Sequence, residues 1–228
     1  HTISRRQRQM CIRDRGVRYG DNNLALSVTG FHTDFKDVIV IDNTNAGGSP
    51  DNGGKVVSKG LELSTVYSPE NLLGVGDITF FTNYTFTNAN LDGDSTTTDS
   101  ESIFAGGRDG SNVPYIPEHV LSFGADYEIN KFDFGINMTY HSETYGTAEE
   151  TETEESIGSA NARAGRIDSA FLLNLRAGYK INDNYKVITG VNNATDLEYI
   201  SSRHPTGARV GAPLTAYIKA VANFDSLF

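Results

Sequence analysis

The feature that most constrains this chain is a strict alternation of apolar and polar residues over strand-length segments. The clearest segment is FDFGINMTY, in which the apolar positions are Phe132, Phe134, Ile136, Met138 and Tyr140. Successive side chains of a β-strand point to opposite faces, so this period of two places the apolar residues on one face and the small or polar residues on the other. No stretch approaches the roughly 18 consecutive apolar residues that a membrane helix requires. The chain is therefore predicted to be all-β.

The same alternation recurs along the chain and predicts eight antiparallel strands. Polar and turn-forming residues separate them. The predicted strands span 22–41, 54–67, 76–90, 117–129, 132–145, 166–181, 184–199 and 212–224. In the sixth of these, Arg176 and Lys180 fall on the less apolar face.

Strand length and connection length favour a transmembrane barrel over a soluble sandwich, which would also alternate but would keep its apolar face inside. Several segments have room for the roughly 9–11 residues that cross a bilayer at a tilt. The turns SPENLLGVG, INKF and INDN are compact, whereas 42–53, 91–116, 146–165 and 200–211 are long and polar. Short turns at one end and long loops at the other are typical of outer-membrane barrels. The aromatic belts would include Tyr67, Tyr127, Tyr140, Tyr145, Tyr179, Tyr185, Tyr199 and Phe224, although Trp is absent.

Residues 1–15 differ from the rest of the chain. This segment, HTISRRQRQMCIRDR, carries five arginines and the only cysteine. It lacks the apolar core and cleavage site of a secretory signal. A basic arm for nucleic acid or anionic lipid is one interpretation. The other, which we favour, is that RRQRQMCIRDR resembles the in-frame translation of a sequencing adapter, so that residues 1–15 are not part of the protein and residues 16–228 are.

Composition then describes a strongly acidic protein. The whole chain has 19 Lys and Arg against 29 Asp and Glu, a net charge of −10. Removing the five arginines and the one aspartate of residues 1–15 leaves a net charge of −14. Without Cys11 no disulfide can form, which suits an oxidising compartment without proving one.

No set of residues in the sequence predicts catalysis. Asn193 and Asp196 have no serine or histidine beside them, and the glycine-rich segment AGGRDGSN lacks the lysine of a phosphate-binding loop. The acidic run TAEETETEES is interpreted as a solvated loop, with cation contacts as the alternative. We therefore expect no enzyme activity, no cofactor, no resident metal site and no nucleic-acid partner.

Four motifs resemble the barrel domain of TonB-dependent outer-membrane receptors. VNNATDLEY resembles the penultimate-strand motif of that family, through Asn192, Asn193, Asp196 and Tyr199. KVVSKGLELSTVY resembles a strand entry that ends in G-x-E, through Gly60 and Glu62, and PYIPEHVLSFGADY resembles a recurring strand entry. The segment SRHPTGARVGAPLTAYIKAVANF is similar to the last loop and strand of ferric-citrate-type receptors. Its matching positions are Arg203, Pro205, Gly207, Ala208, Arg209, Gly211, Ala212 and Pro213, whereas Val210 and Leu214 depart from the pattern.

The resemblance implies a 22-stranded antiparallel barrel in the outer membrane of a Gram-negative bacterium, of which this chain supplies about the last eight strands without the plug domain. It implies import of a ferric siderophore or ferric citrate, energised by the TonB complex through the missing N-terminal region. It also implies contact with outer-membrane lipid and recognition of the C-terminal strand, through Phe224 or Phe228, by the barrel-assembly machinery. The alternative is a self-contained eight-stranded barrel of structural or adhesive type.

The resemblance also suggests candidate residues for ligand binding and for structural roles. Arg203, His204 and Arg209 lie in the last long loop, where cations could meet an anionic ferric chelate. The alternative for these three residues is that they fix the loop backbone or pair with nearby acids. Structural roles are expected for the remaining motif residues, which are Gly60, Glu62, Asn192, Asn193, Asp196, Tyr199, Gly207, Gly211, Pro213 and Phe224.

Overall fold

The computed structural model describes residues 9–36, 38–42, 49–52, 54–97, 102–153, 163–204 and 207–223. Within these ranges no helix is long and apolar enough to span a membrane. The strands are β1 (Gln9–Gly20), β2 (Leu24–Lys36), β3 (Ile39–Asp42), β4 (Ser49–Asn52), β5 (Val56–Tyr67), β6 (Asp77–Leu91), β7 (His119–Ile129), β8 (Phe132–His141), β9 (Thr144–Tyr145), β10 (Arg166–Ile167), β11 (Ala170–Lys180), β12 (Tyr185–Asn192), β13 (Ile200–Ser202), β14 (Arg209–Val210) and β15 (Thr215–Ala222).

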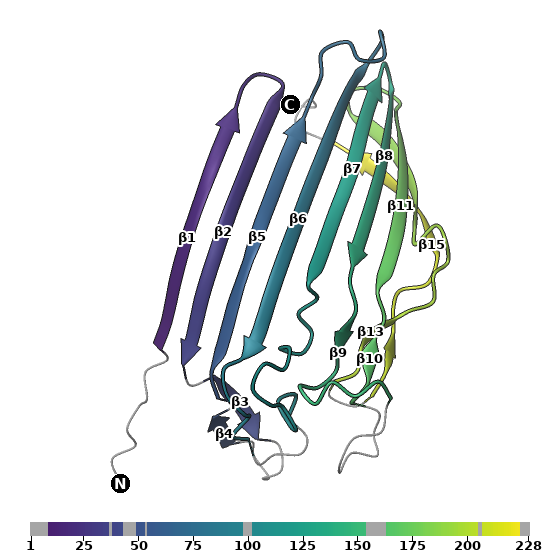
Figure 1. The fold of residues 1–228 in the computed structure, drawn as a ribbon. Helices are drawn as coiled ribbons and strands as arrows, with labels where there is room; N and C mark the ends of the chain where they lie inside the picture. The colour runs from purple at the N-terminus through teal and green to yellow at the C-terminus, as the bar shows by residue number, and fades with distance from the viewer. Residues whose placement is uncertain are drawn as a thin grey trace.

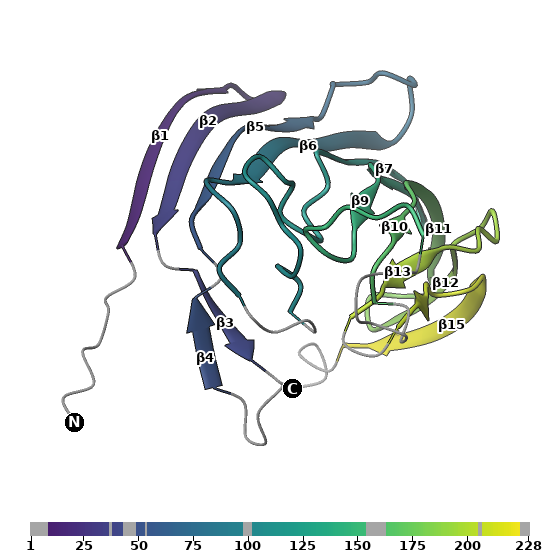
Figure 2. The same ribbon diagram turned by 60° about the horizontal axis from the view of Figure 1, so that its bottom comes forward.

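Nine of these strands form one large antiparallel sheet, which we call the wall. Its order is β1-β2-β5-β6-β7-β8-β11-β12-β15, so each strand pairs with the next long strand along the chain. The wall curves, and in the described part of the chain its two edge strands, β1 and β15, do not pair with each other (Figures 1 and 2). The all-β prediction is confirmed, and the wall is an unclosed part of a barrel.

The short connections lie at one end of the wall and the long connections at the other, as predicted (Figure 1). At the short-turn end, Asp21 accepts hydrogen bonds from the backbone N–H groups of Asn23 and Leu24, at 2.8 and 2.7 Å. Asn182 closes another turn by accepting from the N–H groups of Asn184 and Tyr185. Such side-chain bonds replace the lost ladder bonds and let the chain reverse within a few residues. The long connections gather at the opposite end, which we call the loop end.

Alternation gives the wall an apolar face and a polar face. On the apolar face, the large side chains of Phe132, Phe134 and Phe171 remain 45–48% exposed. Their neighbours in sequence turn to the other face, where Asp133 is only 7% exposed. Exposed aromatic rings beside buried carboxylates invert the arrangement of a water-soluble sheet, and this inversion is what a strand facing lipid requires.

Several strand predictions need correction. The strands expected at 132–145 and 166–181 are each interrupted, the first between His141 and Thr144 and the second between Ile167 and Ala170. The strand expected at 22–41 ends at Lys36, and a separate short strand, β3, begins at Ile39. The strand expected at 184–199 ends at Asn192, because Asn193 adopts a φ of 49° and starts a turn.

The wall also has one strand more than expected. That strand, β1, includes much of the segment interpreted as adapter, and it pairs with β2 along its full length. Backbone pairing along an open strand edge is largely independent of sequence, so the pairing does not test the origin of residues 1–15.

The buried apolar residues lie at the loop end rather than within the wall. One cluster joins residues at the ends of β5 and β6 to residues of the long connections, and its members are Val56, Ala89, Leu91, Phe104, Val113 and Ala148. Phe35, Val38 and Ile103 pack against it. We call this group the loop core. The loops of this end are therefore folded against one another and against the strand ends, instead of extending separately into solvent.

Candidate functional site

The turn that follows β12 is organised by Asn193, a motif residue that is 3% exposed. Its side-chain NH2 donates to the carbonyl oxygens of Leu197 (2.9 Å) and Ala212 (3.1 Å), and its side-chain oxygen accepts from the N–H of Leu197. Asp196, whose φ is 52°, accepts from the N–H of Leu214 at 3.2 Å. Asn193 and Asp196 thus hold the exit of β12 against the segment that leads into β15. Asn192, the last residue of β12, pairs with Thr215.

Two motif glycines permit close approaches. The N–H of Gly211 donates to the carbonyl of Tyr199 at 2.7 Å, and a Cβ at Gly211 would overlap the Tyr199 ring. Gly60 lies in β5, where a Cβ would overlap both the Phe86 carbonyl and the Phe31 ring. Only glycine fits at these two positions without displacing the neighbouring strand or ring. Glu62, two residues after Gly60, is exposed.

The three candidate ligand-binding cations have different environments. Arg203 is 6% exposed, and its Nε donates to the carbonyl of Arg166 at 3.0 Å. Its backbone N–H donates to the Tyr115 hydroxyl at 3.3 Å. His204 is half-buried, and its carbonyl accepts from the Ser202 hydroxyl. Arg209 is exposed on β14, where it pairs with Ser202. The geometry gives Arg203 an anchoring position in the loop end and presents Arg209 to solvent.

The remaining motif positions divide between the described and undescribed residues. Gly207 is buried, and its N–H donates to the Arg203 carbonyl at 2.9 Å. The carbonyl of Pro213 accepts from the Thr215 hydroxyl at 3.0 Å, directly before β15. Pro205, Phe224 and Phe228 lie outside the described residues.

The sequence interpretation missed Arg166, which joins several loop segments. Its guanidinium lies 2.9 Å from Asp168, 3.2 Å from Glu152 and 3.9 Å from Glu143. The hydrogen bond with Asp168, together with the nearby negative charges, raises the pKa of Arg166. Glu152 also accepts a hydrogen bond from Tyr145 at 3.1 Å, and burial followed by this contact raises the pKa of Tyr145. No local pattern marks Arg166, because its partners lie up to 23 residues away in sequence.

Tyr115 was also missed, although it lies inside the quoted segment PYIPEHVLSFGADY. It has a φ of 63°, which is unusual for a residue with a Cβ, and its hydroxyl meets the backbone of Arg203. Burial raises the pKa of Tyr115. Tyr115 therefore connects the 91–116 connection to the 200–211 connection.

A chain of charges crosses four strands on the polar face of the wall. Arg176 lies 2.8 Å from Asp126 and 3.8 Å from Asp133, and Lys186 lies 2.7 Å from the other oxygen of Asp133. The Asp133 side chain is 10% exposed, so this carboxylate depends on its cations for compensation. Arg176 falls on the polar face, as the alternation predicted.

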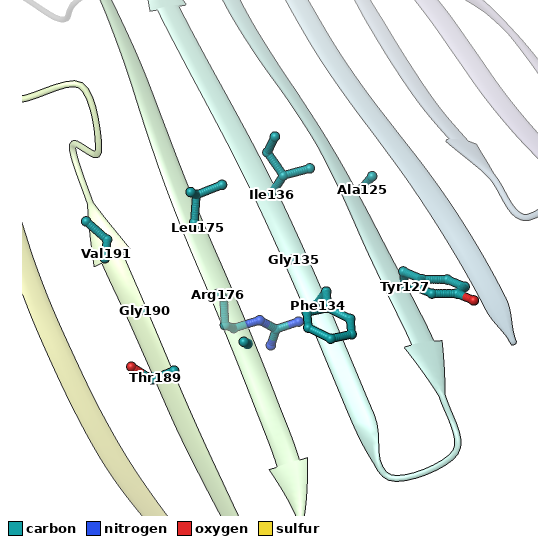
Figure 3. Close-up of a pocket in the computed structure, with 11 residues that line it drawn as sticks. Ala125, Tyr127, Phe134, Gly135, Ile136, Leu175, Arg176, Thr189, Gly190 and Val191 are labelled. Carbon is teal, nitrogen blue, oxygen red and sulfur yellow. The ribbon is translucent and has the colours of Figure 1, made fainter.

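The apolar face carries a hollow of about 490 Å³ across β7, β8, β11 and β12, toward the turn that joins β7 and β8 (Figure 3). Ala125 and Ala177 leave room there, and Phe134, Ile136 and Leu175 line its sides. Its lining is almost entirely apolar, and the Arg176 guanidinium is paired with Asp126. An apolar hollow of this kind suits hydrocarbon and offers nothing to hold a charged chelate.

Within the described residues, no three His, Cys, Asp or Glu side chains are grouped so that they could hold a metal ion. The site chemistry is that of hydrogen bonds and charge: amides and carboxylates that fix turns, an ion chain across the wall, and a loop end in which Arg166 and Arg203 contact protein oxygen atoms. These features define the wall and folded loops of an outer-membrane-type β-barrel.

The sequence of residues 14–194 matches the family described as "TonB dependent receptor-like, beta-barrel". Because that match spans well over half of the chain, the chain belongs to this family. Proteins of this family are receptors and transporters of the outer membrane rather than enzymes.

Solved structures of such receptors share the fold. The unliganded ferric citrate transporter FecA is similar with a TM-score of 0.73 and 22% identity over 93% of this chain. The ferric yersiniabactin uptake receptor FyuA from Yersinia pestis gives 0.72 and 16% over 94%, and the closed form of the ferric-catecholate import receptor Fiu from E. coli K12 gives 0.67 and 19% over 94%. The matched region is 31%, 30% and 27% of those three chains, so this chain spans less than a third of their length.

Proposed function

We propose that this chain is the C-terminal barrel portion of a TonB-dependent receptor that imports a ferric siderophore or ferric citrate across the outer membrane of a Gram-negative bacterium. In the complete receptor, a plug domain and further strands precede this portion, and the TonB complex energises transport through that N-terminal region. The C-terminal strand is the segment that the barrel-assembly machinery recognises. Arg209 and His204 contact the ferric chelate from the loop end, with Arg203 as the anchor that positions their loop.

The observation that carries this proposal is the family match together with a wall that stays open. An unclosed sheet leaves unsatisfied N–H and C=O groups at both edges, which hydrocarbon cannot hydrate. Further strands would satisfy the edges of β1 and β15. No observation favours the self-contained eight-stranded barrel, because within the described residues the two edges of the wall do not meet.

Iron uptake in cells tests the function. We expect a strain that depends on the complete receptor for iron to accumulate radiolabelled ferric citrate or ferric siderophore, and to lose that uptake when TonB is deleted. Arg209→Gln should weaken chelate binding, whereas Arg108→Gln, a cation on another loop-end connection, serves as the matched control. Uptake that persists without TonB, or no binding of any ferric chelate, would overturn the proposal.

We further propose that residues 1–15 are adapter-derived and that the protein proper begins near Gly16. Composition supports this, because residues 1–15 hold five of the chain's 19 Lys and Arg but only one of its 29 Asp and Glu. Long-read sequencing across the codons of Arg15 and Gly16 decides the matter: a frame that continues upstream without RRQRQMCIRDR supports the proposal, and a genomic copy of that string refutes it.

A further inference from the structure

A second cavity lies at the loop end, where the 112–118 segment enters β7. It has a volume of about 320 Å³, and its lining joins the end of β6, the segment before β7, and the region around β8 and β9. The lining residues are Thr87, Ala89, Asn112, Ile116, Glu118, Tyr140, Ser142, Glu143, Thr144, Tyr145 and Ser169. Six of these side chains carry hydroxyl groups, two carry carboxylates, and none carries a positive charge.

Much of this polar lining is not used by the protein itself. Ser142 accepts from the N–H of His119, and Tyr145 donates to Glu152. In the described part of the chain, by contrast, the structure gives no hydrogen bond to the side chains of Thr87, Glu118, Tyr140, Thr144 and Ser169. These groups supply several donors and acceptors that a bound molecule could satisfy together.

Backbone and side-chain hydrogen bonds fix the walls of the cavity. The N–H of Thr87 donates to the carbonyl of Glu118 at 2.8 Å, which fixes the segment before β7 against β6. Asn112 is fixed from two sides, because its side-chain oxygen accepts from Asn90 and its N–H donates to Glu150 at 2.8 Å. A binding site whose walls are fixed before the ligand arrives loses less entropy on binding.

The chemistry of the lining selects one ligand class. The lining has two carboxylates and no cation of its own, and only Glu143 has a cation nearby, Arg166 at 3.9 Å, so an anionic chelate is a poor occupant. Hydroxyl and amide groups offer both donors and acceptors, carboxylates accept from neighbouring hydroxyl groups, and the tyrosine rings offer apolar faces for C–H groups. We propose that this cavity binds a neutral polyhydroxylated group, namely a sugar. The site is separate from the ferric chelate contacts of the proposed function and does not depend on them.

The sugar has two sources, a free saccharide or the headgroup of a glycolipid in the surrounding leaflet. The test uses the full receptor chain in a sugar-free amine oxide detergent and measures saturation-transfer NMR with D-glucose, D-galactose and the cationic D-glucosamine. We expect transfer from a neutral sugar, reduced about tenfold in affinity by Glu118→Gln or Tyr140→Phe. The matched controls outside the cavity, Glu128→Gln and Thr139→Val, should leave the affinity unchanged.

A second arm separates the sources. The receptor is reconstituted in phosphatidylcholine vesicles with or without a galactosyl lipid, and NMR transfer from the lipid sugar is measured. Transfer that requires Glu118 and Tyr140 here, with none from free sugars, assigns the site to a lipid headgroup. Binding of glucosamine alone would show that charge, not hydroxyl recognition, drives binding and would overturn the proposal. Absence of transfer in both arms, or transfer that the cavity variants do not alter, would overturn it as well. Ferric chelate uptake is also measured for the same variants. Normal uptake in a variant that has lost sugar binding shows that the cavity and the ferric chelate contacts are independent sites.

Discussion

The wall and the loop end of this protein are stabilised in opposite ways. Along the wall, apolar side chains such as Phe134 and Leu175 stay exposed, and strands adhere through backbone ladders and polar-face contacts. At the loop end, Phe104 and Ala148 are 5% and 0% exposed, and apolar residues from several connections are buried together. The difference follows from the surroundings of each region. Lipid covers the apolar face of the wall, whereas the loop end is in water and needs a buried core of its own.

The largest loss of stability is expected when a buried ring is removed from the loop core. Phe104→Ala should destabilise the loop end by about 3–5 kcal/mol, because a buried ring is lost and a cavity remains. Amide hydrogen exchange should show faster exchange in 102–116 and 144–152 and unchanged exchange in β8. Phe134→Ala, which removes an exposed ring from the wall, is the matched control. Equal acceleration of exchange in β8 would show that the two regions unfold as one unit.

The ion chain is the corresponding feature of the wall. Lys186→Met should destabilise the wall by about 2–3 kcal/mol, since it leaves the largely buried Asp133 carboxylate without its nearest cation. Denaturant unfolding in lipid vesicles measures the change. The double variant Lys186→Met with Asp133→Asn should recover most of the loss. A double variant as unstable as the single one would contradict this account.

Asn193 tests the boundary between the wall and the loop end. Asn193→Ala should cost about 2 kcal/mol, because it removes the side-chain hydrogen bonds to Leu197 and Ala212 and keeps a positive φ that alanine disfavours. Fraying of the β12–β15 pairing, measured by amide exchange at Ala216, is the readout. Asn184→Ala, a substitution in a turn at the opposite end of the wall, serves for comparison. A β12–β15 ladder that exchanges at its original rate would show that Asn193 is dispensable.

Alkaline pH should separate the two regions. Burial raises the pKa of Tyr115 in the folded protein above its unfolded value near 10. The neutral tyrosine is therefore favoured by folding, so its contribution is fully present below pH 10 and is lost as the pH rises through the folded pKa. We expect proteolysis of the loop end to accelerate above pH 10 while the wall stays protected. Tyr115→Phe should reduce this acceleration, and an unchanged pH profile in that variant would refute the assignment.

The smallest effect is expected at Arg166. Its three carboxylate partners are 58–77% exposed, and exposed ion pairs contribute little. Arg166→Gln should lower loop-end stability only slightly at low salt and by still less at high salt. Thermal unfolding followed by loop-end proteolysis at two salt concentrations measures this. A loss as large as that caused by Phe104→Ala would place Arg166 among the core contacts.

Local sequence patterns predict the faces and the ends of the wall. A period of two decides which residues point to lipid, as in FDFGINMTY, and asparagine and aspartate at compact turns decide where strands reverse, because both depend only on local backbone geometry. It also predicted that the long connections share one end. The predicted end of β12 was wrong because the contacts of Asn193 with Leu197 and Ala212, which hold it in its turn, leave no signal in the local alternation of residues.

Which distant groups meet depends on the tertiary structure. Asp133 meets Lys186, Arg203 meets Arg166 and Tyr115, and Phe104 is buried in one cluster with Ala89 and Ala148, so these groups are 15 to 88 residues apart in sequence. A loop carries no periodic signal, so its packing depends on where the strands place its ends and on which apolar side chains those positions bring together. Burial of Arg203 and exposure of Arg209, six positions apart in one connection, follow from that placement and from nothing in the local sequence.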